Sequence, residues 1–308
     1  MIRNQPGKTM NPEKPVILTP YKLFDAHNHI HDERIYPMLD QVMERAQDAG
    51  IERMAIKGCS EKDWPKVAGI INRYSNIHLA FGLHPWFIGG RSGQWLQTLA
   101  DLLTSYPQAS VGEIGIDHAV ENRADSDQEA VFIAQLELAR KLDRPVTIHC
   151  RGAWGRLMEL LDGFGALPRG MLIHCFGGSP EIAQELVERG ASLSFSGSIT
   201  RPNNKKAGPA IRAVPADRIL LETDAPDLMP YNIVDGASCS VMADQHVMPG
   251  PTGLDAPSTK INEPANLRYV LAKAAELRGI SEAALAELTF RNAERFFDFA
   301  RRATEPPS

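Results

Sequence analysis

The chain has 308 residues, 23% of them charged, and a formal net charge of -5. This length suits one large domain, and the small negative charge excludes a general polyanion-binding surface, so any contact with nucleic acid would be local. The four cysteines, Cys59, Cys150, Cys175 and Cys239, form no C-x-x-C pair. A chain of this size does not need disulfides, so we expect reduced thiols in a cytoplasmic protein.

The two ends of the chain are expected to lie outside the folded domain. Residues 1–21 are rich in Pro, Asn and Lys and lack the apolar core of a signal peptide, which predicts a flexible N-terminal extension. Residues 301–308 are expected to form a C-terminal tail. No apolar run is long enough to cross a bilayer, so we expect no membrane partner. The oligomeric state is left open.

Eight short apolar or β-branched runs alternate with segments of helical periodicity. The runs are residues 23–27, 53–57, 77–82, 109–114, 145–149, 171–174, 191–196 and 218–223. The helical segments between them include residues 36–49, 63–74, 94–106, 128–142, 155–162 and 180–189. Eight strands, each followed by a helix, predict a (β/α)8 TIM barrel spanning residues 22–300. An open doubly wound sheet is the alternative, but the Gly-rich nucleotide-binding motif of that fold is absent.

The alternation of strand and helix patterns is interrupted after the eighth predicted strand. Residues 227–262 are rich in Pro, Gly, Asp and Ser and have no helical period, which predicts a long loop over the catalytic face. We interpret it as a lid-like insertion, with simple disorder as the alternative. Residues 263–278 are expected to form the last barrel helix, and residues 281–299 an extra C-terminal helix that Ser281 caps.

The first strand ends with two histidines, His27 and His29, separated by Asn28. Side chains alternate along a strand, so the two imidazoles are expected on one face and Asn28 on the other. Two neutral imidazoles on one face are half of a metal site, although such a pair is more often two ordinary histidines.

Four further candidate ligands end other predicted strands. They are Glu113, His149, His174 and Asp224. Strand ends converge on one face of a barrel, where catalytic residues come from several strands. Each histidine taken singly is more often structural, but four histidines and two carboxylates at five converging ends are hard to explain as packing. Six ligands suit two divalent ions that share a bridging carboxylate, and the implied reaction is hydrolysis by a metal-bridging hydroxide.

Two other residues near these ends are candidates for binding substrate. Arg151 follows His149 by two residues and would share its face, where its planar guanidinium could clamp a phosphate. His84 ends the third strand and is expected either to contact substrate or to make a structural hydrogen bond. Glu222, two residues before Asp224, is expected to lie behind the ligands.

In their order along the chain, the motifs resemble those of the TatD family of metal-dependent deoxyribonucleases, which belongs to an amidohydrolase-like superfamily. The resemblance rests on His27-Asn28-His29, residues 112–117, 148–151, 174–176, 196–199, 222–224 and 262–267, and on the late segment 289–296. It implies that His27, His29 and Asp224 hold one metal, that His149 and His174 hold the other, and that Glu113 bridges. It also implies that Asp224 orients the attacking water and takes its proton. Zn, Mn, Co or Ni would suit these ligands.

The chain departs from the family pattern outside the predicted ligands. His118 stands where the family commonly has an aromatic residue, Gly177 stands where a serine is common, and residues 227–262 are longer than usual. These changes leave the ligands intact but put the substrate in doubt, because substrate choice resides in the loops above a barrel.

We therefore carry three functional hypotheses. The first is a two-metal nuclease that cleaves phosphodiester bonds of DNA, exonucleolytically on single strands or ends; the basic residues after strand seven would contact the backbone or form a solvated face. These residues are Arg201, Lys205, Lys206 and Arg212. The second is a metal-dependent amidohydrolase or esterase acting on a small molecule. The third, a metal-binding protein without turnover, is disfavoured by the presence of Asp224.

Overall fold

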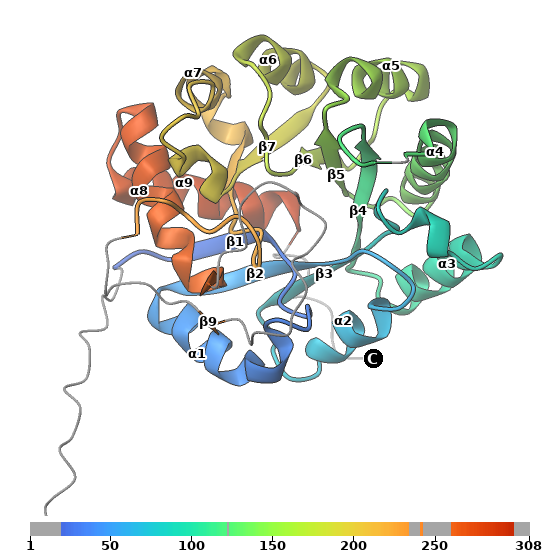
Figure 1. Ribbon diagram of the computed structural model, residues 1–308, viewed down its shortest axis with the longest axis horizontal. Coiled ribbons are helices and arrows are strands. Elements are labelled where there is room, and N and C mark those ends of the chain that lie inside the picture. Colours follow the sequence, from blue (N-terminus) through green and yellow to red (C-terminus); the bar gives the residue numbers. More distant parts are fainter. Residues whose placement is uncertain (1–19, 122, 234–240, 243–259, 299–308) are drawn as a thin grey trace, which may run out of the picture.

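The computed structural model describes residues 20–121, 123–233, 241–242 and 260–298. Eight parallel strands form one sheet in chain order, and helices surround it (Figure 1). The strands are β1 (Leu23–Asn28), β2 (Ile51–Gly58), β3 (Ile77–Phe81), β4 (Ser110–Asp117), β5 (Val146–Arg151), β6 (Met171–Ile173), β7 (Ala191–Phe195) and β8 (Ile219–Leu221). The predicted (β/α)8 barrel is confirmed.

The helices lie outside the strands and pack their apolar sides on them. The α-helices are α1 (Leu39–Asp48), α2 (Trp64–Ile70), α3 (Trp95–Ser105), α4 (Asp125–Lys141), α5 (Trp154–Phe164), α6 (Pro180–Glu188), α7 (Ala207–Ala213), α8 (Leu267–Arg278) and α9 (Glu282–Phe296). Short 3-10 turns are η1 (Tyr36–Met38), η2 (Ile88–Gly90), η3 (Gly197–Thr200), η4 (Ala216–Arg218) and η5 (Pro264–Asn266). The helices expected at 36–49 and 263–278 each begin as such a turn, which contains a proline near its start.

The first and last strands meet at the end of the barrel that carries the predicted ligands. The backbone N–H of Asp224 donates to the carbonyl of His27 at 2.9 Å, and the N–H of His29 donates to the carbonyl of Ala225 at 2.7 Å. Beneath them the buried Asp25 carboxylate accepts bonds from the backbone N–H and the hydroxyl of Thr223. These bonds tie β1 to β8 and fix two ligand-bearing strand ends relative to each other.

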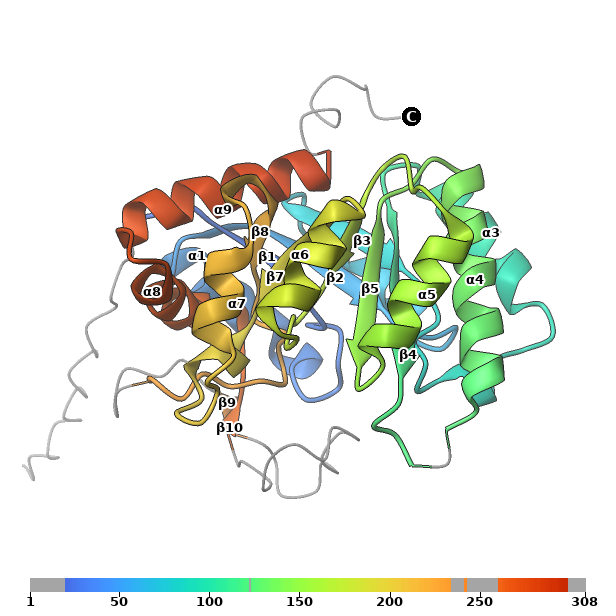
Figure 2. The ribbon, with the colours of Figure 1, turned by 90° about the horizontal axis from the view of Figure 1, so that it is seen from above.

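The opposite end of the barrel is closed by α9 and the residues that follow it (Figure 2). Ser281 caps this helix as expected, since its hydroxyl accepts a bond from the N–H of Ala284 at 3.2 Å. Phe297 is buried and stacks on Phe24 of β1, with ring centroids 5.4 Å apart. The ammonium nitrogen of Lys57, a fully buried residue of β2, lies 4.5 Å from the centre of the Phe297 ring.

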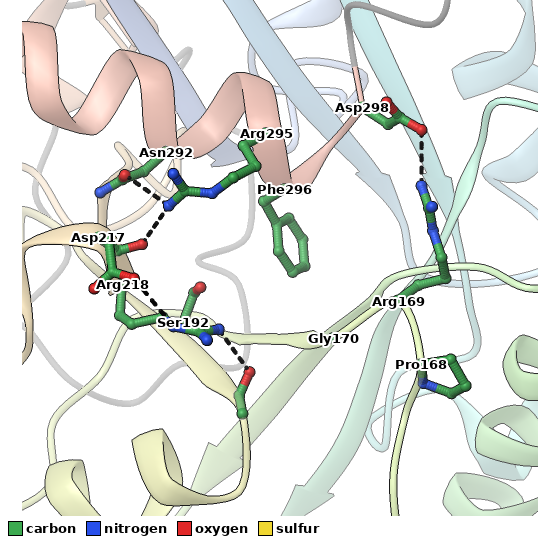
Figure 3. Close-up of a pocket in the computed structure, with 11 residues that line it drawn as sticks. Pro168, Arg169, Gly170, Ser192, Asp217, Arg218, Asn292, Arg295, Phe296 and Asp298 are labelled. Atoms are coloured by element: carbon green, nitrogen blue, oxygen red, sulfur yellow. Dashed lines mark hydrogen bonds and ion pairs between the residues drawn. The ribbon is translucent and has the colours of Figure 1, made fainter.

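A pocket of about 270 Å³ lies beside α9, among three guanidinium groups (Figure 3). Arg169, Arg218 and Arg295 donate respectively to the Asp298 carboxylate, the Gly190 carbonyl and the Asp217 carbonyl. The bonds of Arg169 and Arg295 join α9 and Asp298 to the loops between the strands, and the bond of Arg218 joins two of these loops. The pocket lies away from the C-terminal strand ends, so we assign it to the attachment of the last helix.

The long segment after β8 is described only in part. Its strands β9 (Val241–Met242) and β10 (Lys260–Ile261) pair antiparallel, at the end of the barrel opposite to α9 (Figure 2). Residues 234–240 and 243–259 lie outside the described residues, and so does most of the expected lid. Residues 1–19 and 299–308, most of the two expected flexible ends, also lie outside them. No helix among the described residues is long and apolar enough to span a membrane.

We expect Phe297→Ala to lower the free energy of unfolding by about 3 to 5 kcal/mol, because it removes a buried ring that packs on Phe24. Urea denaturation of the metal-free protein would measure the loss. Ile280→Ala is the control, since the Ile280 side chain is 40% exposed. A similar small loss in both variants would contradict the packing role.

Candidate metal centre

The Glu113 carboxylate is the point on which the predicted ligands converge. Its Oε2 lies 3.1 Å from Nε2 of His27 and 3.3 Å from Nε2 of His29, both from the end of β1. Its Oε1 lies 3.0 Å from Nδ1 of His149 on β5 and 2.8 Å from Nε2 of His174 after β6. The two oxygens of one carboxylate therefore face two separate pairs of imidazoles.

Asp224 completes the first of these two groups. Its Oδ1 lies 3.6 Å from Nε2 of His29 and 3.7 Å from Nε2 of His27. The ligand atoms of His27, His29 and Asp224 lie close enough together to hold one ion. The structure thus brings together all six residues that the sequence singled out as ligands.

Hydrogen bonds behind the ligands fix which ring nitrogens face the centre. Nδ1 of His29 lies 3.0 Å from the Lys57 carbonyl, which only accepts, so Nδ1 carries a proton. Nε2 of His149 lies 3.2 Å from the Asp117 carboxylate and donates to it. In the neutral rings of His29 and His149, the nitrogens that face Glu113 are therefore lone-pair donors. This is the orientation that a metal ligand requires.

The charges of the centre also favour a bound cation. Burial alone would raise the pKa of Glu113, but His174, His84 and His27 outweigh it and hold the pKa well below its usual value. Burial alone would lower the pKa of His174, but Glu113 and Glu222 outweigh it and raise the pKa well above the ordinary value. Both shifts show that the carboxylates stabilise positive charge between them. Lone pairs that point at a carboxylate fit divalent cations that lie among them.

His84 reaches the centre as a hydrogen-bond donor. Its Nδ1 accepts a bond from the backbone N–H of Trp86 at 3.1 Å, which leaves the proton on Nε2, 3.2 Å from Oε1 of Glu113. Its lone pair is therefore occupied, so His84 is better placed to orient Glu113 than to bind a metal. Burial lowers the pKa of His84 to about 4 and keeps the ring neutral. The structural role that the sequence left open is the one that these contacts favour.

Three carboxylates or amides stand behind the ligands. Asp117 is fully buried and accepts bonds from His149 and from the indole N–H of Trp86 at 2.7 Å. The strand-end pattern in the sequence did not single out Asp117, although it lies four residues after Glu113 in the same strand. Glu222 lies 3.5 Å from Nδ1 of His174, as its expected place behind the ligands requires. Asn28 turns from the centre and donates to Asp25 at 3.0 Å.

Gly115 explains how β4 and β5 approach each other at the centre. It pairs with His149 in the sheet and has a φ of +148°. A Cβ atom here would lie 2.0 Å from the carbonyl oxygen of His149. Only glycine allows this approach, which sets the distance between Glu113 and His149.

Two cavities open on the centre. The cavity beside β1–β3, of about 430 Å³, is called the acidic cavity here. Besides the ligand Glu113, its own charged lining consists of Asp32, Glu33, Arg34 and Asp63. The cavity beside β5–β7, of about 520 Å³, is called the basic cavity; its own charged lining consists of Arg151 and Arg201. They share a wall of Trp86, His149, His174, Asp224 and Asp227. Both volumes lie in the usual range of ligand sites.

The structure separates the basic residues that the sequence grouped. Arg151 is half-buried in the basic cavity and has no acidic partner among the described residues. Of the four basic residues after β7, Arg201 alone lines this cavity, with its guanidinium 5.9 Å from the ring of Tyr231. Arg212 instead donates to the carbonyl of Leu277 in α8. Lys205 and Lys206 are exposed at the start of α7.

Several known proteins are similar to this chain in sequence or in structure. A family model described as TatD related DNase matches residues 24–298. The chain is 31% identical to the uncharacterized metal-dependent hydrolase YabD of Bacillus subtilis over 89% of this chain and 98% of YabD. It is 29% identical to the 3'-5' ssDNA/RNA exonuclease TatD of Shigella flexneri over 90% and 100% of the two chains. The crystal structure of YJJV, a TatD homolog of Escherichia coli, superposes with a TM-score of 0.78 at 26% identity, over 90% and 98% of the chains.

We expect the metal-free protein to lose stability as the pH falls from 6.5 to 4. His84 has a folded-state pKa of about 4 and an ordinary value of 6.5, so the unfolded chain binds more protons in this window. Between pH 6.5 and 4, the His84→Gln variant should lose up to about 3 kcal/mol less unfolding free energy than the wild-type protein. Urea denaturation in the presence of a chelator would measure it, with His118→Gln as a partly exposed control. An unchanged pH slope in the His84 variant would refute the assignment.

Proposed function

The chain belongs to the TatD family of metal-dependent hydrolases, and from this premise we propose that it is a two-metal exonuclease that removes nucleotides from the 3' ends of single-stranded DNA or RNA. The observation that carries the two-metal proposal is the Glu113 carboxylate, whose two oxygens face two separate imidazole pairs. The names of the TatD relatives support the choice of substrate.

In this proposal each ion has its own ligands. His27, His29 and Asp224 would hold one ion, His149 and His174 would hold the other, and Glu113 would be a ligand of both. Imidazole and carboxylate together suit Zn, Mn, Co or Ni. When bound, the ions polarise the phosphoryl oxygen and lower the pKa of water at the site.

The chain's own residues orient the water and move its proton. Asp224 lies at the shared wall of the two cavities, where both open on the centre. A carboxylate at this place can orient the attacking water and accept its proton. The water oxygen bonds to phosphorus, the ester P–O bond breaks, and the proton passes to the leaving oxygen. His84 and Asp117 position Glu113 and His149 during this step.

The surfaces around the centre suit a single strand. Arg151 supplies a guanidinium without an acidic partner among the described residues, as a phosphate contact requires. Two aromatic side chains are exposed nearby: Phe87, 41% exposed, lines the acidic cavity, and Tyr231, 52% exposed, lies beside Arg201 of the basic cavity. Exposed rings stack on unpaired bases whatever their sequence, so they favour single strands over duplexes.

The substrate class is tested by direct comparison. Metal-loaded protein is expected to shorten an end-labelled single-stranded oligonucleotide by one nucleotide at a time and to leave a panel of lactones and amides intact. Denaturing gels and product chromatography give the two readouts. Activity on the panel with none on DNA or RNA would instead establish the small-molecule amidohydrolase or esterase.

The ligand roles are tested by metal content. We expect Glu113→Ala to lose most of both metals, because it removes a ligand of each, and Asp224→Asn to keep at least one metal per chain while turnover falls at least a thousandfold. Elemental analysis after gel filtration measures the metals. Asp217→Asn, an exposed change near α9, is the control. Normal metal content in the Glu113 variant would refute the bridge.

A further inference from the structure

The two cavities on either side of the centre differ in charge, and a nucleic acid strand must enter both when an internal phosphate is at the metals. On one side of that phosphate lies the single nucleoside that is removed, and on the other lies the rest of the strand. The remaining strand carries further phosphates, whereas the end nucleoside carries none if it ends in a hydroxyl. The charges of the cavities therefore bear on which part occupies which cavity.

The acidic cavity carries a surplus of negative charge. Arg34 supplies the one guanidinium in the lining of this cavity. It donates hydrogen bonds to the Asp32 carboxylate at 2.9 and 3.0 Å and to the Asp227 carboxylate at 2.9 and 3.2 Å. Four of its five N–H donors are thereby used, and two negative charges face one positive charge. Arg34 is thus not available to bind a phosphate.

Asp63 adds a further carboxylate to this cavity. It accepts bonds from the backbone N–H groups of Cys59 and Ser60, and its nearest ionisable partner is His31, at 3.6 Å. It has no lysine or arginine partner among the described residues. Glu33, the other acid of this lining that is not a proposed ligand, is paired with Lys66. The acidic cavity therefore disfavours a phosphate but offers acceptors for hydroxyl groups.

The basic cavity has the opposite character. Its own lining contains Arg151 and Arg201, the amides of Asn203 and Asn204, and the half-buried ring of Trp154. Among the described residues it has no carboxylate outside the shared wall. Arginine and amide donors bind phosphate oxygens, and the ring can stack on a base. This cavity suits the part of the strand that keeps its phosphates.

We propose that the acidic cavity receives the end nucleoside and selects strands that end in a free hydroxyl, while the basic cavity holds the remaining strand. This inference rests on the proposed nuclease function and adds a preference for the terminal group. Phe87 would stack on the end base. The carboxylates of Asp32 and Asp63, which line only this cavity, would repel a terminal phosphate.

The test compares two single-stranded oligonucleotides of identical sequence, labelled at the 5' end, that end in a 3'-hydroxyl or a 3'-phosphate. With metal-loaded protein we expect kcat/KM for removal of the first nucleotide to be at least tenfold higher for the hydroxyl end. Equal rates, or a faster reaction of the phosphate end, would overturn the inference and leave the nuclease function standing. No cleavage of either strand would remove the proposed function and this inference with it.

Two variants connect the preference to the cavity. Asp63→Asn and Asp32→Asn each remove one negative charge and keep a hydrogen-bond acceptor, and each should lower the hydroxyl-to-phosphate ratio about fivefold. Arg201→Ala is the matched change in the basic cavity and should slow both strands alike. Asp217→Asn, at the other end of the barrel, should leave the ratio unchanged. Asp32 and Asp63 lie on different loops, so if one variant fails to fold the other still tests the cavity. The hydroxyl-to-phosphate ratio of the wild-type protein tests the preference without either variant.

Discussion

The Glu113 carboxylate, held between two pairs of imidazoles, is the constraint around which this end of the barrel is arranged. Its two oxygens lie 2.8 to 3.3 Å from four imidazole nitrogens that come from β1, β5 and the end of β6. That arrangement places acceptor atoms against one another and is favourable only if positive charge lies among them. Hydrogen bonds to Asp117, His84 and the Lys57 carbonyl orient His149, Glu113 and His29. The positive charge is therefore expected between the imidazoles and the Glu113 carboxylate.

The barrel supplies the rigidity that this arrangement needs. β1 and β8 are joined at the centre by backbone bonds and by the Asp25 carboxylate, so His27 and Asp224 cannot move independently. At the far end, α9 and Phe297 close the interior. The ligands stand at strand ends. Of the residues that would meet substrate, Arg151 ends β5, whereas Phe87 and Arg201 lie in the loops after β3 and β7. Such a division lets the family keep one chemistry while the loops choose the substrate.

The charged side chains around the centre bear on which part of the substrate each cavity accepts. Metal-dependent hydrolysis needs only the ligands, whereas a preference for strand ends needs a cavity that accepts one nucleoside and disfavours further phosphates. Arg34 is informative because its charge is spent on Asp32 and Asp227. An arginine beside a phosphate-cleaving site would otherwise be assigned to the phosphate. Its two carboxylate partners, which only the folded chain brings together, indicate that Arg34 neutralises acidic side chains and does not bind the phosphate.

The sequence by itself determined the barrel and the six candidate ligands, because strand and helix periods are local and because parallel strand ends must converge on one face. It also located the Ser281 cap. It did not find Asp117 or the different roles of the arginines, since these depend on contacts between residues that are distant in the chain. Arg34 and Asp227 are 193 positions apart, and His149 and Asp117 are 32 apart. Only the tertiary structure decided which nitrogen each histidine turns to the centre and which side of the centre is acidic, because hydrogen-bond partners and local charge are properties of the folded chain.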